Sequence, residues 1–182
     1  MYNTNMKHLL TIRQQDIHPN SPVVDTSNFR QRRAARAVLL DRDEQVYMMK
    51  VGKRGFHKLP GGGVDEGETV EQALARELLE EVGCRAEVIA ELGTITEYRD
   101  YDGEGLEQVS YCYLAKQIGT QGASSLEDNE LEDGMEAVKV GSIDEAINIL
   151  SSDKPDNLGG KFMQHRDLVI LKAVKNRVDS GN

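Results

Sequence analysis

A glycine-rich turn followed by a helix crowded with acids constrains this chain more than any other feature. The stretch Gly62-Gly63-Val64-Asp65-Glu66-Gly67-Glu68 is followed, after seven residues, by Arg76-Glu77-Leu78-Leu79-Glu80-Glu81-Val82-Gly83-Cys84. These two stretches hold six carboxylates, which Arg76 alone cannot neutralise. Like charges three and four residues apart destabilise a helix by about 0.2–0.5 kcal/mol per pair. The cluster therefore predicts a bound cation, and its oxygen ligands suit Mg²⁺, with Mn²⁺ as the alternative.

The residues between the glycines and Gly83 have the periodicity of one helix. Apolar side chains recur at helical spacing, at Val70, Ala73, Leu74, Leu78 and Val82. We expect a helix over about residues 69–82, ending at Gly83 because glycine readily closes a helix C-terminus. A merely solvated acidic face would explain Glu71 and Glu87. It does not explain three glutamates beside the apolar stripe without matching bases.

The spacing of these residues resembles the complete box of the Nudix hydrolases. The fixed positions, in order, are Gly62, Glu68, Arg76, Glu77, Leu78, Glu80, Glu81, Gly83 and Cys84. The box covers residues 62–84, and the flanking chain resembles the family more loosely over residues 33–150. Subfamilies differ outside the box, so the resemblance leaves the subfamily open.

Residue patterns before and after the helix predict an α/β fold. Strands on both sides of one helix, with further helices at the end, favour a mixed β-sheet in a layered sandwich. The resemblance sharpens this expectation to the Nudix-type α/β/α sandwich. We expect one Nudix hydrolase domain over residues 1–182. Residues 1–29 would form an N-terminal extension with a first strand, and residues 162–178 a C-terminal amphipathic helix.

The resemblance also implies roles for the acids. Members of the family cleave a phosphoanhydride of a nucleoside diphosphate derivative with bound metal and an attacking water. By resemblance the metal ligands are Glu77, Glu80 and Glu81, with a carbonyl of the glycine turn, assigned to Gly62, and a later acid. Four acids of the later loop are candidates for that last ligand, and Glu136, just before a predicted strand, is favoured over Glu127, Glu130 and Glu132. A solvated acidic loop is the alternative.

The same resemblance places further catalytic roles on the helix. Glu80 or Glu77 would take the proton of the attacking water. Arg76 would orient the carboxylates through its fork of donors, and Glu68 would accept from it and close the loop onto the helix.

Substrate-binding residues are predicted outside the box. The basic side chains Arg36 and Lys58 are candidates for the substrate phosphates, against the alternative of a solvated strand face. Tyr101 lies seventeen residues past the box, where the diadenosine polyphosphate branch tends to carry a tyrosine. The chain has no proline between Pro60 and Pro155, which counts against the ADP-ribose branch.

Composition limits the classes of function. Hydrophobic residues make up 38% and charged residues 29%, as in an ordinary soluble protein. No apolar run approaches the roughly 18 residues of a membrane span, and no signal peptide is visible, so we expect a cytoplasmic protein. The net charge of −9 argues against a nucleic-acid partner. It allows a small nucleotide-like diphosphate, because bound cations invert the local charge.

The expected function is therefore Mg²⁺-dependent hydrolysis of a nucleoside diphosphate derivative. The substrate could be a nucleoside triphosphate, a dinucleoside polyphosphate or a nucleotide sugar. The alternative is a regulatory domain of the same fold that binds a nucleotide derivative without hydrolysing it. Such domains usually have a degraded box, and metal-dependent turnover distinguishes the two. Many relatives dimerise, so a homodimer is kept open, although no interface motif is visible.

Overall fold

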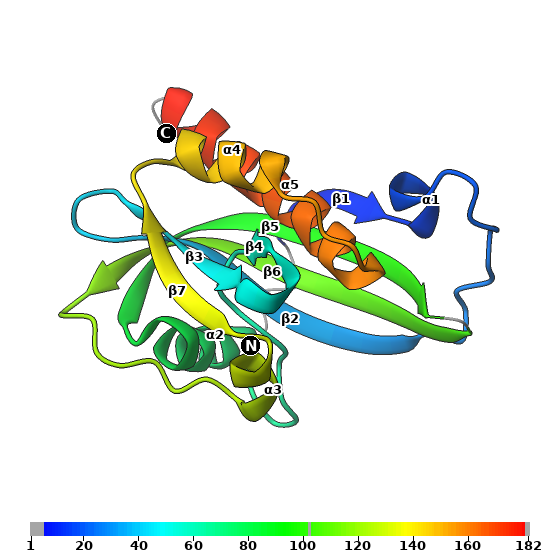
Figure 1. The fold of residues 1–182 in the computed structure, drawn as a ribbon, viewed down its shortest axis with the longest axis horizontal. Coiled ribbons are helices and arrows are strands. Elements are labelled where there is room, and N and C mark those ends of the chain that lie inside the picture. Colours follow the sequence, from blue (N-terminus) through cyan, green and yellow to red (C-terminus); the bar gives the residue numbers. More distant parts are fainter. Residues whose placement is uncertain (1–5, 102, 181–182) are drawn as a thin grey trace.

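The computed structural model describes residues 6–101 and 103–180, which form a seven-stranded mixed sheet with helices on both faces (Figure 1). The strands are β1 (His8–Ile12), β2 (Arg30–Leu40), β3 (Val46–Val51), β4 (Phe56–Lys58), β5 (Arg85–Tyr101), β6 (Glu104–Ile118) and β7 (Met135–Val140). The helices are α1 (Gln14–Ile17), α2 (Val70–Glu77), α3 (Asp128–Glu132), α4 (Ile143–Ser152) and α5 (Leu158–Asp179). A 3-10 turn, η1 (Gly52–Arg54), and a π-helical turn, η2 (Leu78–Val82), complete the elements. The expected α/β fold with a mixed sheet is confirmed.

The sheet mixes parallel and antiparallel pairs. Its order is β1-β5-β6-β2-β3-β4, and β7 also pairs with β3. Strands β1 and β5, and strands β2 and β6, run parallel, whereas β5 and β6 form a long antiparallel hairpin. The short N-terminal strand β1 thereby closes one edge of the sheet.

The sheet splits open between β2 and β4. Strand β2 pairs with β3 only through Leu39 and Leu40, and β4 then pairs with the rest of β3. Because β7 pairs along the whole of β3, β2 and β4 must share its other edge. The chain that follows β4 enters this split, and the glycine turn lies there.

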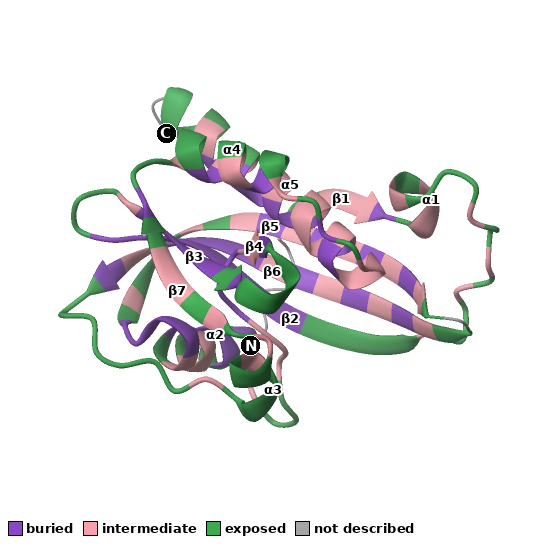
Figure 2. Ribbon diagram, in the orientation of Figure 1, coloured by how far each residue is buried: buried purple, intermediate pink, exposed green. Residues whose placement is uncertain are grey.

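Two apolar cores hold the layers together. One lies between the sheet and the C-terminal helices, around Val38, Leu114, Phe162 and Ile170. The other lies between the opposite face and α2, around Ala37, Leu74 and Leu78. Figure 2 shows the matching alternation of buried and less buried residues along β5 and β6. Each face of the sheet therefore has its own helical cover.

The expected helix over residues 69–82 exists but changes type. Thr69 caps it, accepting a hydrogen bond from the Gln72 backbone amide at 3.1 Å. The α-helical part ends at Glu77, and a π-helical turn continues to Val82 before Gly83 closes it with a φ of 74°. Single π-helical turns often occur at functional sites. Here the turn carries Glu80 and Glu81.

The C-terminal helix starts four residues earlier than expected, at Leu158 rather than Phe162. Asn157 caps it by accepting from the Gly160 amide at 2.8 Å. A side chain at Gly160 would press on Pro155 and Phe56, so this position requires glycine inside the helix. Two successive glycines are typical of a loop, so the sequence predicts a loop at Gly159-Gly160 although the pair is helical. Among the described helices, none combines the length and apolar character needed to cross a membrane.

Candidate active site

The glycine turn is hydrogen-bonded to β2 where the sheet splits. The Ala35 amide donates to the Gly62 carbonyl at 2.9 Å, and the Ala37 amide donates to the Pro60 carbonyl at 3.2 Å. A Cβ at Gly61, whose φ is 123°, would run into the Ala35 carbonyl. A Cβ at Gly62 would collide with the carboxylate of Glu77. The glycines thus let the turn pass between β2 and the acids of the helix.

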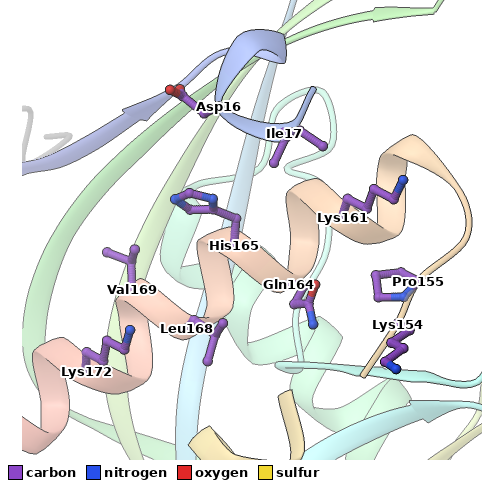
Figure 3. A pocket seen from close by; sticks show the side chains of 10 residues that line it. All are labelled: Asp16, Ile17, Lys154, Pro155, Lys161, Gln164, His165, Leu168, Val169 and Lys172. Carbon is purple, nitrogen blue, oxygen red and sulfur yellow. The ribbon is translucent and has the colours of Figure 1, made fainter. Parts of the chain in front are cut away.

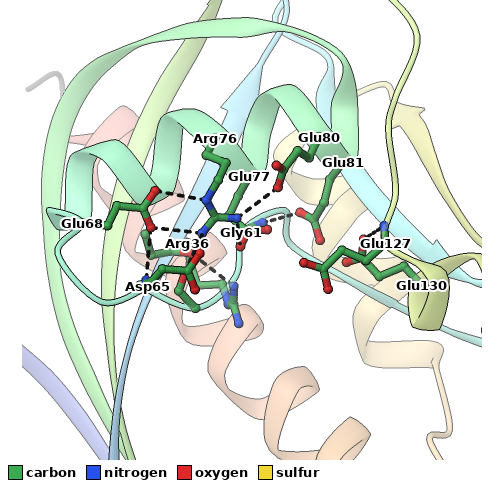
Figure 4. A network of polar contacts seen from close by, with 12 residues as sticks. Arg36, Gly61, Asp65, Glu68, Arg76, Glu77, Glu80, Glu81, Glu127 and Glu130 are labelled. Atoms are coloured by element: carbon green, nitrogen blue, oxygen red, sulfur yellow. Dashed lines mark hydrogen bonds and ion pairs between the residues drawn. The ribbon is translucent and has the colours of Figure 1, made fainter.

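Arg76 ties the turn to the acids of the helix (Figure 4). Its guanidinium donates to Glu68 at 3.0 Å, to Glu77 at 2.9 Å and to Glu80 at 3.0 Å. It also donates to the Gly63 carbonyl at 3.0 Å. The predicted orienting geometry of Arg76 and Glu68 is therefore present in the structure, with one fork of donors facing several carboxylates.

Glu81 points inward and is held by a different set of donors. Only 1% of the residue is exposed. The Gly61 amide donates to one carboxylate oxygen at 2.5 Å, and the Lys58 ammonium donates to the other at 2.8 Å. Glu81 thus faces the turn and β4, whereas Glu77 and Glu80 face Arg76.

The electrostatics of the acids differ with their neighbours. Burial raises the pKa of Glu77, and repulsion from Glu81 raises it further. The hydrogen bonds from Arg76 lower the pKa of Glu68 below its ordinary value. The pKa of Arg76 is raised, chiefly by Glu68. Ionised Glu77 is therefore disfavoured mainly by burial and further by its neighbour Glu81, in spite of the hydrogen bond from Arg76.

The donors available here are those of a hard divalent cation. Across residues 6–101 and 103–180, no three acid, histidine or cysteine side chains already converge as ligands on one point. The carboxylates of Glu77, Glu80 and Glu81 instead share the cations of Arg76 and Lys58. Carboxylate and carbonyl oxygens beside a side-chain-free turn suit Mg²⁺ or Mn²⁺. A metal at this place would compete with Lys58 for Glu81.

Arg36 lies on β2 at the centre of the split and is 5% exposed. Its guanidinium donates to the Ala35 carbonyl at 3.2 Å, while its Nε has no hydrogen-bond partner among the described residues. Burial lowers its pKa to about 10, and nearby Arg166 adds to this effect. Arg36 thus presents an under-compensated cation close to the acids, as in Figure 4.

Lys58 and Tyr101 line one cavity of about 490 Å³ between β4, the end of β5 and the start of α5. Phe56, Met135 and Met163 form part of its apolar wall, and Asn157 adds a polar group. The Tyr101 hydroxyl accepts from Arg99 at 3.3 Å. Two of the predicted substrate-binding residues therefore line one cavity, and one of them, Lys58, also contacts Glu81.

The structure places Glu136 and Glu130 differently from each other. Glu136 lies on β7, exposed, and pairs with Lys50 at 2.9 Å. Glu130 lies on the far side of Glu81 from Arg76 in Figure 4. Burial raises the pKa of Glu130, and repulsion from Glu81 contributes. Among the acids of the later loop, Glu127 and Glu130 are drawn with the helix acids in Figure 4, the favoured Glu136 is not, and Glu130 interacts electrostatically with Glu81.

The approach of Glu130 has a backbone cause. The Ser125 amide donates to the Glu80 carbonyl at 2.7 Å, and the Gly122 amide donates to the Gly83 carbonyl at 2.7 Å. These bonds fasten the loop before α3 to the end of the π-helical turn. Sequence spacing carries no signal of such loop-to-helix contacts, which is why it favoured Glu136 over Glu130.

A group of buried charges lies on α5 and β5 that the sequence did not single out. Arg166, Asp167 and Glu97 are each 0% exposed. Arg166 donates to Asp167 at 2.7 Å and approaches Glu97 at 3.5 Å. Helical spacing does indicate that Arg166 is buried, because it lies four residues from both Phe162 and Ile170, which are core residues.

A second cavity, of about 520 Å³, lies away from the acids of the helix on the outer side of α5 (Figure 3). Its lining residues come from three places: α1, the segment that follows α4, and α5 itself. Three lysines border it, at Lys154, Lys161 and Lys172. Leu168 and Val169 form its apolar floor. None of the residues assigned to the carboxylate site lines this cavity.

The chain matches a known protein family over most of its length. The NUDIX domain family model matches residues 30–158. The RNA pyrophosphohydrolase of Aeromonas hydrophila subsp. hydrophila is 41% identical over 64 residues, covering 35% of this chain and 37% of that protein. The RNA pyrophosphohydrolase of Francisella tularensis subsp. mediasiatica is 35% identical over 80 residues, covering 44% of this chain and 50% of that protein. The chain thus spans half or less of the length of these relatives.

Two solved structures share the fold. The ADP compounds hydrolase superposes with a TM-score of 0.59 at 19% identity, covering 85% of this chain and 77% of that one. The MutT NUDIX hydrolase from Burkholderia pseudomallei gives a TM-score of 0.54 at 24% identity, covering 80% and 98%. At these identities the likeness concerns the fold alone.

Proposed function

The chain belongs to the NUDIX family, and from this premise we propose that it is a divalent-metal-dependent pyrophosphohydrolase of nucleoside diphosphate derivatives. The single observation that carries the proposal is the arrangement around Arg76, which presents Glu77 and Glu80 beside the glycine turn that contacts Glu81. Because both apolar cores pack on one sheet, we assign this activity to a single domain.

The proposed ligands of Mg²⁺, with Mn²⁺ as the alternative, are Glu77, Glu80, Glu81 and a carbonyl of the glycine turn. The Gly62 carbonyl already accepts one hydrogen bond from Ala35, which leaves one lone pair free. Bound metal would neutralise phosphate charge and lower the pKa of a coordinated water. Glu136 stays a prediction as a further ligand, and the position of Glu130 makes it the stronger candidate.

The protein groups would then divide the hydrolysis between them. Water attacks one phosphorus, the bond from that phosphorus to the bridging oxygen breaks, and the second phosphate leaves. Glu80 or Glu77 takes the proton of the water. Arg76 and Glu68 keep the carboxylates in place. Arg36 would bind phosphate oxygens, because its buried guanidinium retains an unused donor.

The cavity next to Lys58 would hold the rest of the substrate. Tyr101 offers a face for a nucleobase, and the apolar wall of Phe56 and Met163 suits an uncharged ring. The chain has no tryptophan, so Tyr101 is the aromatic group proposed for stacking. The substrate class we propose first is a small nucleotide, as the net charge of −9 favours.

A 5′-triphosphate RNA is a second candidate substrate. It carries the same phosphoanhydride, and the relatives from Aeromonas hydrophila and Francisella tularensis described above bear the name RNA pyrophosphohydrolase. The lysine-bordered cavity on α5 is one described surface suited to a longer anionic chain. Lys154→Glu with Lys172→Glu would then impair hydrolysis of RNA but not of nucleoside triphosphates.

The test is a substrate panel with Mg²⁺ and purified protein. It contains nucleoside triphosphates, dinucleoside polyphosphates, nucleotide sugars, ADP-ribose and a short 5′-triphosphate RNA, with products identified by chromatography. Turnover of one class that stops on chelation supports the proposal and supplies the substrate. Tight nucleotide binding without turnover would instead favour the regulatory domain.

A further inference from the structure

Both donors that fix the Glu81 carboxylate come from one short segment, residues 58–61. The Lys58 ammonium and the Gly61 amide each contact one oxygen, at 2.8 Å and 2.5 Å. Wherever this segment moves, the carboxylate of Glu81 must follow or lose its partners. The position of Glu81 is thus set outside its own helix.

The segment is in turn fastened to the C-terminal helix. The amide of Leu59, midway between the two donors, donates to one carboxylate oxygen of Asp167 at 2.8 Å. Leu59 and Asp167 are both 0% exposed, so this bond is shielded from bulk solvent. Helix α5 therefore reaches the metal-binding acids through one backbone hydrogen bond.

Asp167 is itself held in one orientation. Its second oxygen accepts from Arg166 Nε at 2.7 Å, and Arg166 lies 3.5 Å from Glu97. Glu97 accepts from Arg99 and from Gln108, each at 2.7 Å. The carboxylate of Asp167 is thus fixed against the long β5–β6 hairpin as well as against α5.

The network is a poor way to gain stability alone. Burying ion pairs costs desolvation, and apolar replacements of similar size are often equally stable or better. Both terminal nitrogens of Arg166 also lack a hydrogen-bond partner within the described part of the chain. Asp167 is a buried charge with one oxygen bonded to the Leu59 amide next to the site, and a demand for position explains it better than stability does.

We propose that Asp167 is a positioning residue that sets the metal affinity of Glu81 through the Leu59–Gly61 segment. This inference rests on the proposed metal site, and it adds α5 to the parts of the fold that shape it. Residues around a metal site that orient its ligands typically change metal affinity by about 10–100-fold when replaced.

Asp167→Asn is the decisive variant. An asparagine has one acceptor oxygen, so it can serve the Leu59 amide or Arg166 but not both. We expect Mn²⁺ binding, measured by electron paramagnetic resonance without substrate, to weaken about ten-fold. Asp144→Asn, an exposed acid of α4 paired with Lys175, is the matched control and should leave Mn²⁺ affinity unchanged.

A double-mutant cycle separates positioning from general destabilisation. If Asp167 acts through Glu81, Asp167→Asn should cost no further Mn²⁺ affinity in a Glu81→Gln background, because interacting sites are non-additive. In a Glu77→Gln background the ten-fold loss should persist. Equal losses in all backgrounds would overturn the inference. If Asp167→Asn fails to unfold cooperatively, Arg166→Gln takes its place in the cycle, with the same expected pattern.

The outcomes also distinguish this inference from the proposed function. Mn²⁺ binding that is equally tight in wild type and Asp167→Asn would overturn the role of Asp167 alone. Normal Mn²⁺ binding without hydrolysis of any substrate would overturn the proposed activity, while the cycle still tests Asp167. Wild-type protein that binds no Mn²⁺ would overturn both.

Discussion

The ammonium of Lys58 lies 2.8 Å from a carboxylate oxygen of Glu81, a residue that is 1% exposed. A lysine on β4 thus supplies positive charge to an acid on the π-helical turn. An ion pair with so little exposure is only weakly screened by solvent. Binding of a divalent cation at Glu81 must therefore displace or share this ammonium.

Lys58→Met should make the thermal stability of the protein depend more strongly on bound metal. Without the ammonium, the Glu81 carboxylate keeps one hydrogen bond to the described residues, from the Gly61 amide, so the metal-free protein should lose stability. Added Mg²⁺ should then raise the Tm of Lys58→Met by more than that of wild type, because ligands stabilise the state they bind. Thermal unfolding with and without Mg²⁺ measures this. An equal or smaller rise would mean that Lys58 and the metal do not compete.

Glu77→Gln and Glu81→Gln should have opposite effects on the metal-free fold. Burial and Glu81 raise the pKa of Glu77 above 4.5, so its ionised form disfavours the folded state at neutral pH. Removing that charge should increase stability. Glu81→Gln instead leaves Lys58 without its carboxylate and should cost about 1–3 kcal/mol. Chemical denaturation in the presence of a chelator measures the free energy of unfolding of both variants. A more stable Glu81→Gln would contradict the partners assigned to Glu81.

Arg36→Met should weaken substrate binding without harming the fold. The side chain is 5% exposed, a methionine of similar length fills the same space, and the hydrogen bond lost is the one to the Ala35 carbonyl, so we expect a small loss of stability. We expect KM to rise about ten-fold with a smaller change in kcat, as for a group that binds substrate and transition state alike. Steady-state kinetics beside a thermal melt test this. An unchanged KM would remove Arg36 from the substrate site.

Ionised Glu97 should stabilise the folded protein at neutral pH but not at strongly acidic pH. Burial alone would raise its pKa, but Arg166 and Arg99 hold the pKa below 4.5. An acid with a depressed folded pKa stabilises the fold above its unfolded pKa, and this contribution disappears as pH falls through the folded value. Glu97→Gln should therefore lower the free energy of unfolding at neutral pH, and the gap to wild type should narrow well below pH 4.5. A gap that is constant with pH would show that the charge of Glu97 is irrelevant.

The helix and its acids could be predicted because residues close together in the sequence determine them. The apolar spacing from Val70 to Val82 defines the buried face of the helix, and Gly83 ends it. The resemblance of the box then gave the fold, which the structure confirms. The change to a π-helical turn at Leu78 has no counterpart in that spacing.

Contacts between distant segments could not be predicted in the same way. Glu130 nears Glu81 because loop amides bind the end of the helix, and no periodicity marks that loop. Asp167 follows Arg166 on a helix whose apolar stripe was visible, yet its partner is the backbone of Leu59, 108 residues away. Backbone partners leave no residue pattern, so this part of the site needed the structure.

The most direct test of the central claim is metal-dependent hydrolysis by wild type, Glu80→Gln and Glu71→Gln. Glu71 lies exposed on α2, so it controls for loss of one acid from that helix. We predict that wild type and Glu71→Gln cleave the same phosphoanhydride only with Mg²⁺ or Mn²⁺, and that Glu80→Gln loses this turnover while keeping its fold. Turnover by Glu80→Gln at the wild-type rate, or cleavage that persists in chelator, would contradict it.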